Sequence, residues 1–286
     1  MSDLKELKSR IKSVQNIMKV TNAMYLISAS KIAKLEIEEK KAKTFANKIK
    51  STLSEINLLD ENLKKTNDKE LLLVTFSPQR GLAGSLPTNL FKEIKKFTDT
   101  KKDKKIFVIN IGKKLSKRIS NAYPDLIADF GNISEKPTSV EIKTISRAID
   151  EIQTKYNISN LYFAYTFYIN ALSQKPMVDQ ILPYKNELET KSLQSKFKLE
   201  PNAASIKVQL MELYIENMIY SKELEASLSE HSARMVSMKS ARDNATHLKD
   251  FLNIEYNKER QKIITEEIIE INSGAQIWQK EKSYKF

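Results

Sequence analysis

The C-terminal stretch of the chain carries a nearly continuous apolar pattern with the spacing of a coiled coil. Its seam residues recur in steps of three and four: Leu224, Leu228, His231, Met235 and Met238, and later Ile264, Ile268, Ile271, Ala275 and Trp278. No proline follows Pro201, so the pattern predicts one helix from about Ala203 to Lys282. At 1.5 Å per residue this helix is about 120 Å long, several times the diameter of a small domain. It therefore needs a partner helix.

The N-terminal stretch supplies a matching pattern. Apolar residues again recur in steps of three and four: Leu4, Leu7, Ile11, Val14 and Met18. Neither glycine nor proline occurs before Pro78, which predicts a second long helix from Ser2 to about Asn57. Two long helices at opposite ends of a chain, joined through a domain between them, are expected to pair antiparallel.

Between the two helices the sequence changes to short apolar runs punctuated by all seven prolines and four of the five glycines. The pattern predicts strands at 71–76, 106–111, 126–130, 161–169 and 177–182, and helices at 86–97, 113–120 and 139–156. Strands that alternate with helices indicate a largely parallel sheet. The predicted fold class is therefore α/β: a long antiparallel coiled coil of N- and C-terminal helices (1–60 and 203–286) with a small Rossmann-like α/β domain (61–202) inserted between them.

The chain offers little of the chemistry that an enzyme needs. The segment 79–85 follows the first predicted strand and precedes a helix, where backbone amides can hold a phosphate, but it matches neither the Walker pattern nor G-x-G-x-x-G. We interpret it as a tight turn that packs the helix against the sheet. There is no cysteine, and the two histidines are His231 and His247, so neither a metal site nor a cofactor is expected. His231 occupies a seam position and is interpreted as a core residue.

The net charge of +12 is concentrated at the N-terminus, where residues 1–50 hold 12 Lys and Arg against 5 Asp and Glu. A basic helix fits an acidic protein partner, a nucleic acid or an anionic membrane surface. No run of 18 apolar residues occurs, so direct membrane insertion is not expected. Two alternatives remain open at this point: a nucleotide-binding enzyme built on the α/β domain, and a coiled-coil adaptor or nucleic-acid binder that uses the basic helix.

Nearly the whole chain resembles the gamma subunits of F-type ATP synthases, which form the central rotor stalk. The C-terminal resemblance lies in Ser229–Met235, Asn244-Ala245, Tyr256-Asn257, Arg260-Gln261, Ile264–Glu266 and Glu270–Ala275. The N-terminal resemblance lies in Arg10-Ile11, Ser13-Val14, Thr21, Ala23-Met24, Ala29 and Lys31. The segment Arg80-Gly81-Leu82, with Gly84, is similar to the central domain of the family.

The resemblance implies a non-catalytic shaft that rotates inside a hexamer of alternating catalytic and non-catalytic subunits and couples transmembrane ion flow to ATP synthesis or hydrolysis. The implied partners are this hexamer, the epsilon subunit and the membrane ring, with no nucleic acid. The N-terminus lacks the apolar block of a signal peptide, and no presequence is expected. A bacterial protein, bound peripherally at the cytoplasmic face of the cell membrane, is therefore expected.

The resemblance also implies which residues touch those partners. Arg234, Gln261, Thr265 and Glu267 match family positions near the acidic loops of the catalytic subunits, and Met24 matches the methionine of the coupling region. Two further possibilities remain: the rotor of an F-type-like motor with another task than ATP synthesis, and a coiled-coil adaptor for an acidic partner.

Overall fold

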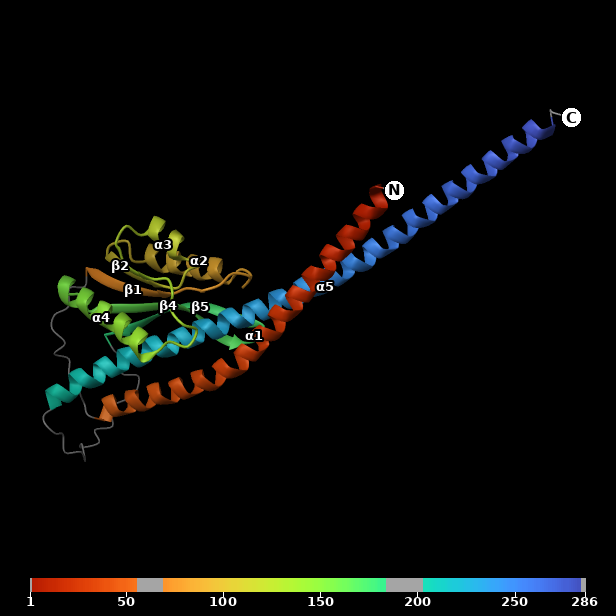
Figure 1. The fold of residues 1–286 in the computed structure, drawn as a ribbon. Coiled ribbons are helices and arrows are strands. Elements are labelled where there is room, and N and C mark those ends of the chain that lie inside the picture. The colour runs from red at the N-terminus through yellow and green to blue at the C-terminus, as the bar shows by residue number, and fades with distance from the viewer. Residues whose placement is uncertain (1, 56–68, 184–202, 284–286) are drawn as a thin grey trace. The chain divides into compact units, whose positions relative to one another are not determined.

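Two long helices open and close the chain. The computed structural model describes residues 2–55, 69–183 and 203–283 (Figure 1). Helix α1 spans Ser2–Glu55 and helix α5 spans Ala203–Ser283. Both agree with the helices predicted from the heptad pattern. The side chain of Trp278, a predicted seam residue, lies outside the described part.

A five-stranded sheet lies between the helices in the sequence. Its strands are β1 (Glu70–Phe76), β2 (Lys105–Ile111), β3 (Leu126–Phe130), β4 (Asn160–Asn170) and β5 (Ser173–Leu182). Their order is β3-β2-β1-β4-β5, and β5 pairs antiparallel with β4 whereas the other pairings are parallel. The predicted largely parallel sheet is confirmed.

Three shorter helices connect the strands: α2 (Leu86–Asp99), α3 (Ser116–Ala122) and α4 (Ser139–Tyr156). Helix α4 begins at a capping box, in which Thr138 accepts from the Glu141 amide and the Glu141 carboxylate accepts in return. Helix α3 begins three residues later than predicted. Residues 113–115 are used for the turn after β2, where the Lys114 amide donates to the Pro78 carbonyl at 2.9 Å.

The structure divides into two compact units, residues 27–237 and residues 1–26 with 238–286. In the first unit both faces of the sheet are covered. One face packs against α4 and the beginning of α5, through residues such as Ile149 and Ile219, and the other packs against α2 and α3 through Leu90 and Ile119. Burial on both faces explains why β1 and β2 read as uninterrupted apolar runs.

Helices α1 and α5 also pair along their apolar seams. In the unit of residues 27–237, Ile32 and Leu35 pack with Leu224 and Leu228. In the other unit the contacts are made by Leu7, Ile11, Val14 and Met18 with Ala245 and Leu252. Within each unit α1 and α5 run antiparallel, as predicted (Figure 1).

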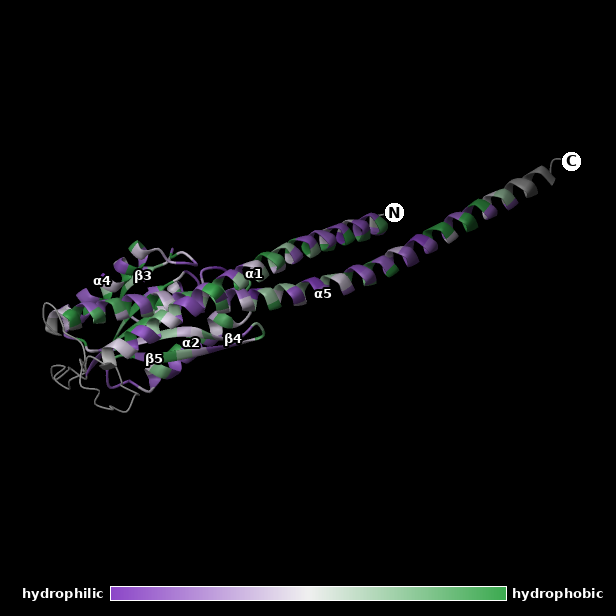
Figure 2. Cartoon of the chain, turned by 90° about the horizontal axis from the view of Figure 1, so that it is seen from below, coloured by the Kyte–Doolittle hydropathy of each residue, from purple (hydrophilic) through white to green (hydrophobic). Residues whose placement is uncertain are grey.

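The last part of α5 is not covered by α1, which corrects the expectation that the N-terminal helix would serve as its partner there. Ile264, Ile268 and Ile271 are 45%, 53% and 71% exposed. The reason is length: α1 has 54 residues and α5 has 81, and the first turns of α1 already pack against Ala245 and Leu252. Figure 2 shows hydrophobic residues continuing along this part of α5. Within the described residues, no helix has the length and apolar character needed to cross a membrane.

Candidate functional site

The most elaborate polar site in the unit of residues 27–237 surrounds the loop between β1 and α2. The loop turns sharply, with positive φ at Leu82 (64°) and Gly84 (58°). A side chain at Gly84 would also approach the Ser237 hydroxyl on α5 to 3.1 Å, so glycine suits both the backbone and the packing here. The loop therefore lies close against α5.

A carboxylate from α5 accepts hydrogen bonds from two backbone amides of this loop. The Gln79 amide donates to Glu230 Oε2 at 2.7 Å, and the Arg80 amide donates to Glu230 Oε1 at 3.1 Å. These amides are of the kind that hold phosphates in nucleotide-binding loops. Residues 79–85 form a turn between β1 and α2, as predicted, and its first two amides bind an anion of the chain itself.

Arg234, one helical turn after Glu230, completes the arrangement. Its guanidinium donates to the Glu230 carboxylate through Nη2 and to the Gly81 carbonyl through Nε at 3.1 Å. Both side chains are buried, at 4% exposure for Arg234 and 5% for Glu230. The pair neutralises both charges away from water and ties the loop to α5 by several bonds at once.

His231 extends the network as a buried core residue, as its seam position predicts. Arg234 Nη1 lies 3.3 Å from His231 Nδ1, and His231 Nε2 lies 3.3 Å from Glu135 Oε1. Burial lowers the pKa of His231, which favours the neutral ring. A neutral ring that accepts at Nδ1 carries its proton on Nε2, so we assign a hydrogen bond from Nε2 to Glu135.

Glu135 links the network to α1. Its Oε2 accepts from Lys31 Nζ at 2.7 Å, and its Oε1 lies 3.7 Å from Arg80 Nη2. Burial alone would raise the pKa of Glu135, but the Lys31 hydrogen bond and the neighbouring positive charges hold it below its usual value. The carboxylate therefore stays ionised near neutral pH and joins the loop after β3 to α1 and to His231 on α5.

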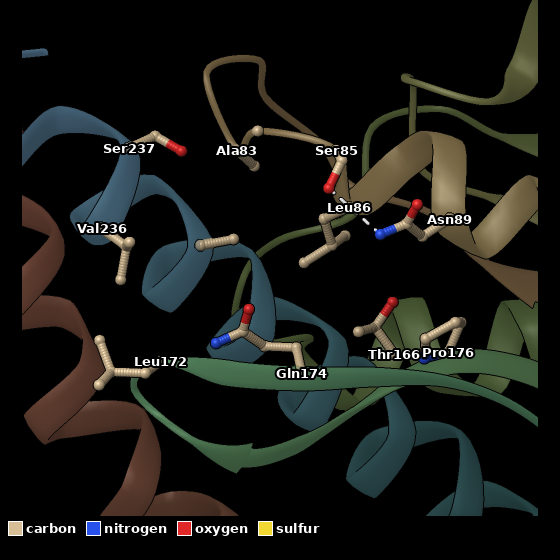
Figure 3. Close-up of a pocket in the computed structure, with 12 residues that line it drawn as sticks. Ala83, Ser85, Leu86, Asn89, Thr166, Leu172, Gln174, Pro176, Val236 and Ser237 are labelled. Atoms are coloured by element: carbon tan, nitrogen blue, oxygen red, sulfur yellow. Dashed lines mark hydrogen bonds between the residues drawn. The ribbon is translucent and has the colours of Figure 1, made fainter. Parts of the chain in front are cut away.

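A small cavity of about 180 Å³ lies beside the loop (Figure 3). The start of α2 lines one side with Ser85, Leu86 and Asn89, while Thr166 of β4 and Ser237 of α5 line others. Asn89 donates to the Ser85 hydroxyl at 3.2 Å. The cavity has no charged lining residue and no pair of groups suited to acid–base chemistry.

Glu223, also on α5, is a buried carboxyl of a different kind. It is 2% exposed, and its Oε2 meets no hydrogen-bond partner among the described residues. Burial, and then the charges of Glu230 and Glu141, raise its pKa well above the ordinary value. The native state therefore holds Glu223 protonated at pH values where the unfolded chain has released this proton.

The pKa shift of Glu223 predicts a pH-dependent stability. As the pH rises above the unfolded-state pKa, about 4.3, this one group lowers the free energy of unfolding by up to about 1.4 kcal/mol per pH unit. The loss continues until the pH reaches the raised native pKa. Glu223→Gln is expected to remove this contribution, so its stability should exceed that of the wild type increasingly with pH.

Urea denaturation of the purified chain between pH 4 and 8 measures this difference. Glu212→Gln, an exposed position on the same helix, is the matched control and should follow the wild type throughout. Parallel pH profiles of Glu223→Gln and wild type would show that Glu223 is ionised in the native state.

The predicted coupling residues are divided between the two units. Met24 is partly buried on α1, and Gln261, Thr265 and Glu267 are exposed on α5, all in the unit of residues 1–26 and 238–286. Thr265 donates to the Gln261 carbonyl at 2.8 Å, so these two lie one turn apart. Arg234 lies in the other unit and is engaged by Glu230 and Gly81. The partner-binding roles of all five stay predictions.

Sequence reasoning assigned no role to Glu230 or Glu135. The spacing of Glu230 and Arg234 by four residues was a visible signal for an ion pair on one helix face. Glu135 gave no such signal, since its partners lie about a hundred residues away on α1 and α5. Among the described residues, no group of three His, Asp or Glu side chains is arranged to hold a metal ion.

Comparisons with known proteins agree on one family. A family model described as ATP synthase matches residues 3–277. The ATP synthase gamma chain of Stenotrophomonas maltophilia (strain R551-3) is 33% identical over 284 residues, which cover 96% of this chain and 99% of that protein. The gamma chain of Xanthomonas axonopodis pv. citri (strain 306) is 32% identical over 286 residues, with the same coverage.

Solved structures share the fold. The central stalk of the Tetrahymena thermophila mitochondrial ATP synthase aligns with a TM-score of 0.58 and 23% identity, covering 78% of this chain and 99% of that one. A chain of the Euglena gracilis mitochondrial ATP synthase aligns with a TM-score of 0.65 and 15% identity, covering 98% and 96%. Because their sequence identity is below 25%, the two solved structures establish the fold only. The two gamma chains, at 32–33% identity, establish the family.

Proposed function

Because the chain belongs to the family of ATP synthase gamma chains, we propose that it is the central rotor shaft of an F-type ATP synthase. It is a non-catalytic subunit that turns inside a hexamer of alternating catalytic and non-catalytic subunits and couples ion flow to ATP synthesis or hydrolysis. Its further partners are the epsilon subunit and the membrane ring. It works at the cytoplasmic face of a bacterial membrane, held there by the complex.

The family match supports this proposal most strongly, since it runs through residues 3–277 and both terminal helices. The match also disfavours a separate coiled-coil adaptor or a nucleotide-binding enzyme. The bonds around Glu230 and Arg234 fit a shaft as well. They attach the loop after β1 to α5 through several buried interactions, so a force applied to one is transmitted to the other.

The exposed apolar residues at the end of α5 support a surrounding partner. Ile264, Ile268 and Ile271 lie at helical spacing and are largely exposed in this chain. Exposed apolar residues in a row mark surfaces that other proteins cover. We assign this row to contact with the interior of the hexamer, together with Gln261, Thr265 and Glu267 on neighbouring positions.

Purification of the tagged chain from its own membranes in mild detergent tests the proposal. The expected result is co-purification of a hexameric ATPase, the epsilon subunit and a membrane ring, with multi-site ATP hydrolysis that depends on this chain. A chain that is recovered alone, or with nucleic acid, would contradict the rotor assignment.

A triple variant in which Ile264, Ile268 and Ile271 are all replaced by serine tests whether these residues serve coupling or the stability of the chain. The free energy of unfolding of the purified chain should change by less than about 1.5 kcal/mol, about 0.5 kcal/mol for each exposed position. Ion transport per ATP hydrolysed should fall several-fold in membrane vesicles that carry the variant complex. Serine at the exposed positions Lys262, Glu266 and Glu270 is the matched control. Equal losses in both triple variants would contradict a specific role for the isoleucines.

A further inference from the structure

A second hollow in the unit of residues 27–237 lies where three parallel strands end. This groove, of about 870 Å³, is lined by Gln79 and Arg80 after β1, by Lys113 after β2 and by residues 132–136 after β3. Helix α1 forms its other wall with residues 31–38. In parallel α/β sheets, ligands bind beyond the carboxyl ends of the strands. The volume is also in the range of small-molecule sites.

Positive charge dominates the groove. Its cationic lining residues are Lys31, Lys34, Arg80, Lys113 and Lys136, against the carboxylates Glu38 and Glu135. Each carboxylate already has a lysine partner. Glu135 lies 2.7 Å from Lys31, and Glu38 lies 3.0 Å from Lys136. The negative charge of each carboxylate is therefore balanced by one lysine. Lys34, Arg80 and Lys113 remain as an excess of positive charge.

The other cationic side chains that line the groove have no close acceptor within residues 2–55, 69–183 and 203–283. Among the described residues, neither Lys34 nor Lys113 has an anionic partner. Arg80 approaches Glu135 no closer than 3.7 Å, and its side chain is 71% exposed. The side-chain amide nitrogen of Gln79 is buried and has no acceptor in the described part of the chain. Three cations therefore line the groove with unused donors, and Gln79, which also lines it, has a buried amide without an acceptor.

We propose that this groove binds the phosphate chain of a small polyphosphate, either inorganic tripolyphosphate or a nucleoside triphosphate. Each phosphate carries negative charge and several acceptor oxygens, so a chain of three satisfies Lys34, Lys113 and Arg80 together. A monovalent anion neutralises one cation and leaves the others. None of the described lining residues is aromatic, so the phosphate chain is recognised and a nucleobase is not stacked.

The groove also suggests what binding would do. Lys34 lies on α1, Lys113 lies in the loop after β2, and Arg80 lies in the loop that Glu230 and Arg234 tie to α5. A bound phosphate chain bridges these elements and stabilises their packing. Because a ligand of the native state raises stability in proportion to the logarithm of its concentration, binding should raise the melting temperature of the chain.

Calorimetric titration of the purified full chain at moderate salt tests the proposal, with inorganic tripolyphosphate as the first probe. We expect saturable binding of one equivalent and a rise in melting temperature. The variant Lys34→Gln/Lys113→Gln should bind at least about tenfold more weakly. Neither lysine makes an ion pair among the described residues, so this variant should melt like the wild type without ligand. Lys92→Gln/Lys95→Gln, exposed on α2, loses the same charge and is the control.

Further probes identify the source of the phosphate chain. Equal affinity for ATP and tripolyphosphate assigns recognition to the phosphates alone, whereas tighter ATP binding that is lost in the same variant assigns the site to a nucleotide. Absence of saturable binding by the wild type would overturn the proposal, as would equal weakening in both double variants. Binding of a short glutamate-rich peptide without tripolyphosphate binding would also overturn it and assign the groove to a protein segment.

Discussion

Glu230→Gln is expected to lower the free energy of unfolding of the chain by about 3–5 kcal/mol, the usual cost of breaking a buried ion pair on one side. The substitution leaves the Arg234 guanidinium buried without its counter-charge. It also places a donor where an acceptor is needed, because Glu230 Oε1 and Oε2 both accept from backbone amides. In either orientation, the glutamine NH2 group faces an N–H group of the loop.

Urea denaturation of the purified chain measures this loss. Glu212→Gln on the exposed side of α5 removes the same charge and should change stability by less than about 0.5 kcal/mol. The double variant Glu230→Gln/Arg234→Met should be less destabilised than the sum of its single variants, since it leaves no uncompensated charge. A loss below about 1 kcal/mol for Glu230→Gln would mean that water reaches Arg234 in solution.

The fold could be predicted because its elements obey local rules. Strands β1 and β2 are buried on both faces, and their apolar runs end where glycine or proline enters the sequence. The edge strand β5 was predicted from Met177 onward but begins at Ser173. Its first residues are polar, since they are half exposed, and their pairing with β4 supplies the strand conformation that the pattern does not show.

The site could be predicted only in part, because its hydrogen bonds and ion pairs join residues that are far apart in the sequence. The sequence shows a glycine-containing loop after a strand, but it does not show that Glu230 occupies the loop amides from about 150 residues away. The same holds for the bonds of Glu135 to Lys31 and His231. Conversely, the repeat at Ile264 to Ile271 indicates an apolar seam without indicating that α1 leaves this part of α5 exposed.

Met24→Lys is expected to uncouple the motor far more than it destabilises the shaft. Met24 is partly buried on α1, in the stretch where the apolar pattern is least regular. A lysine there can lay its methylene stem along the helix and direct its ammonium to water, so the free energy of unfolding should fall by about 1 kcal/mol or less. ATP-driven ion pumping per ATP hydrolysed should fall several-fold in vesicles if Met24 contacts the surrounding subunits, because the new charge would then lie in that contact.

Ala23→Lys adds the same charge at an exposed position one residue earlier and separates the two explanations of such a loss. If coupling depends on the surface that Met24 presents, Ala23→Lys should keep most of the wild-type pumping ratio. If coupling responds to the charge of α1 as a whole, both variants should lose the same fraction. A wild-type ratio in Met24→Lys would refute the assignment of Met24 to coupling while leaving the family and the fold untouched, since these rest on the match over residues 3–277 and on the helix pairing itself.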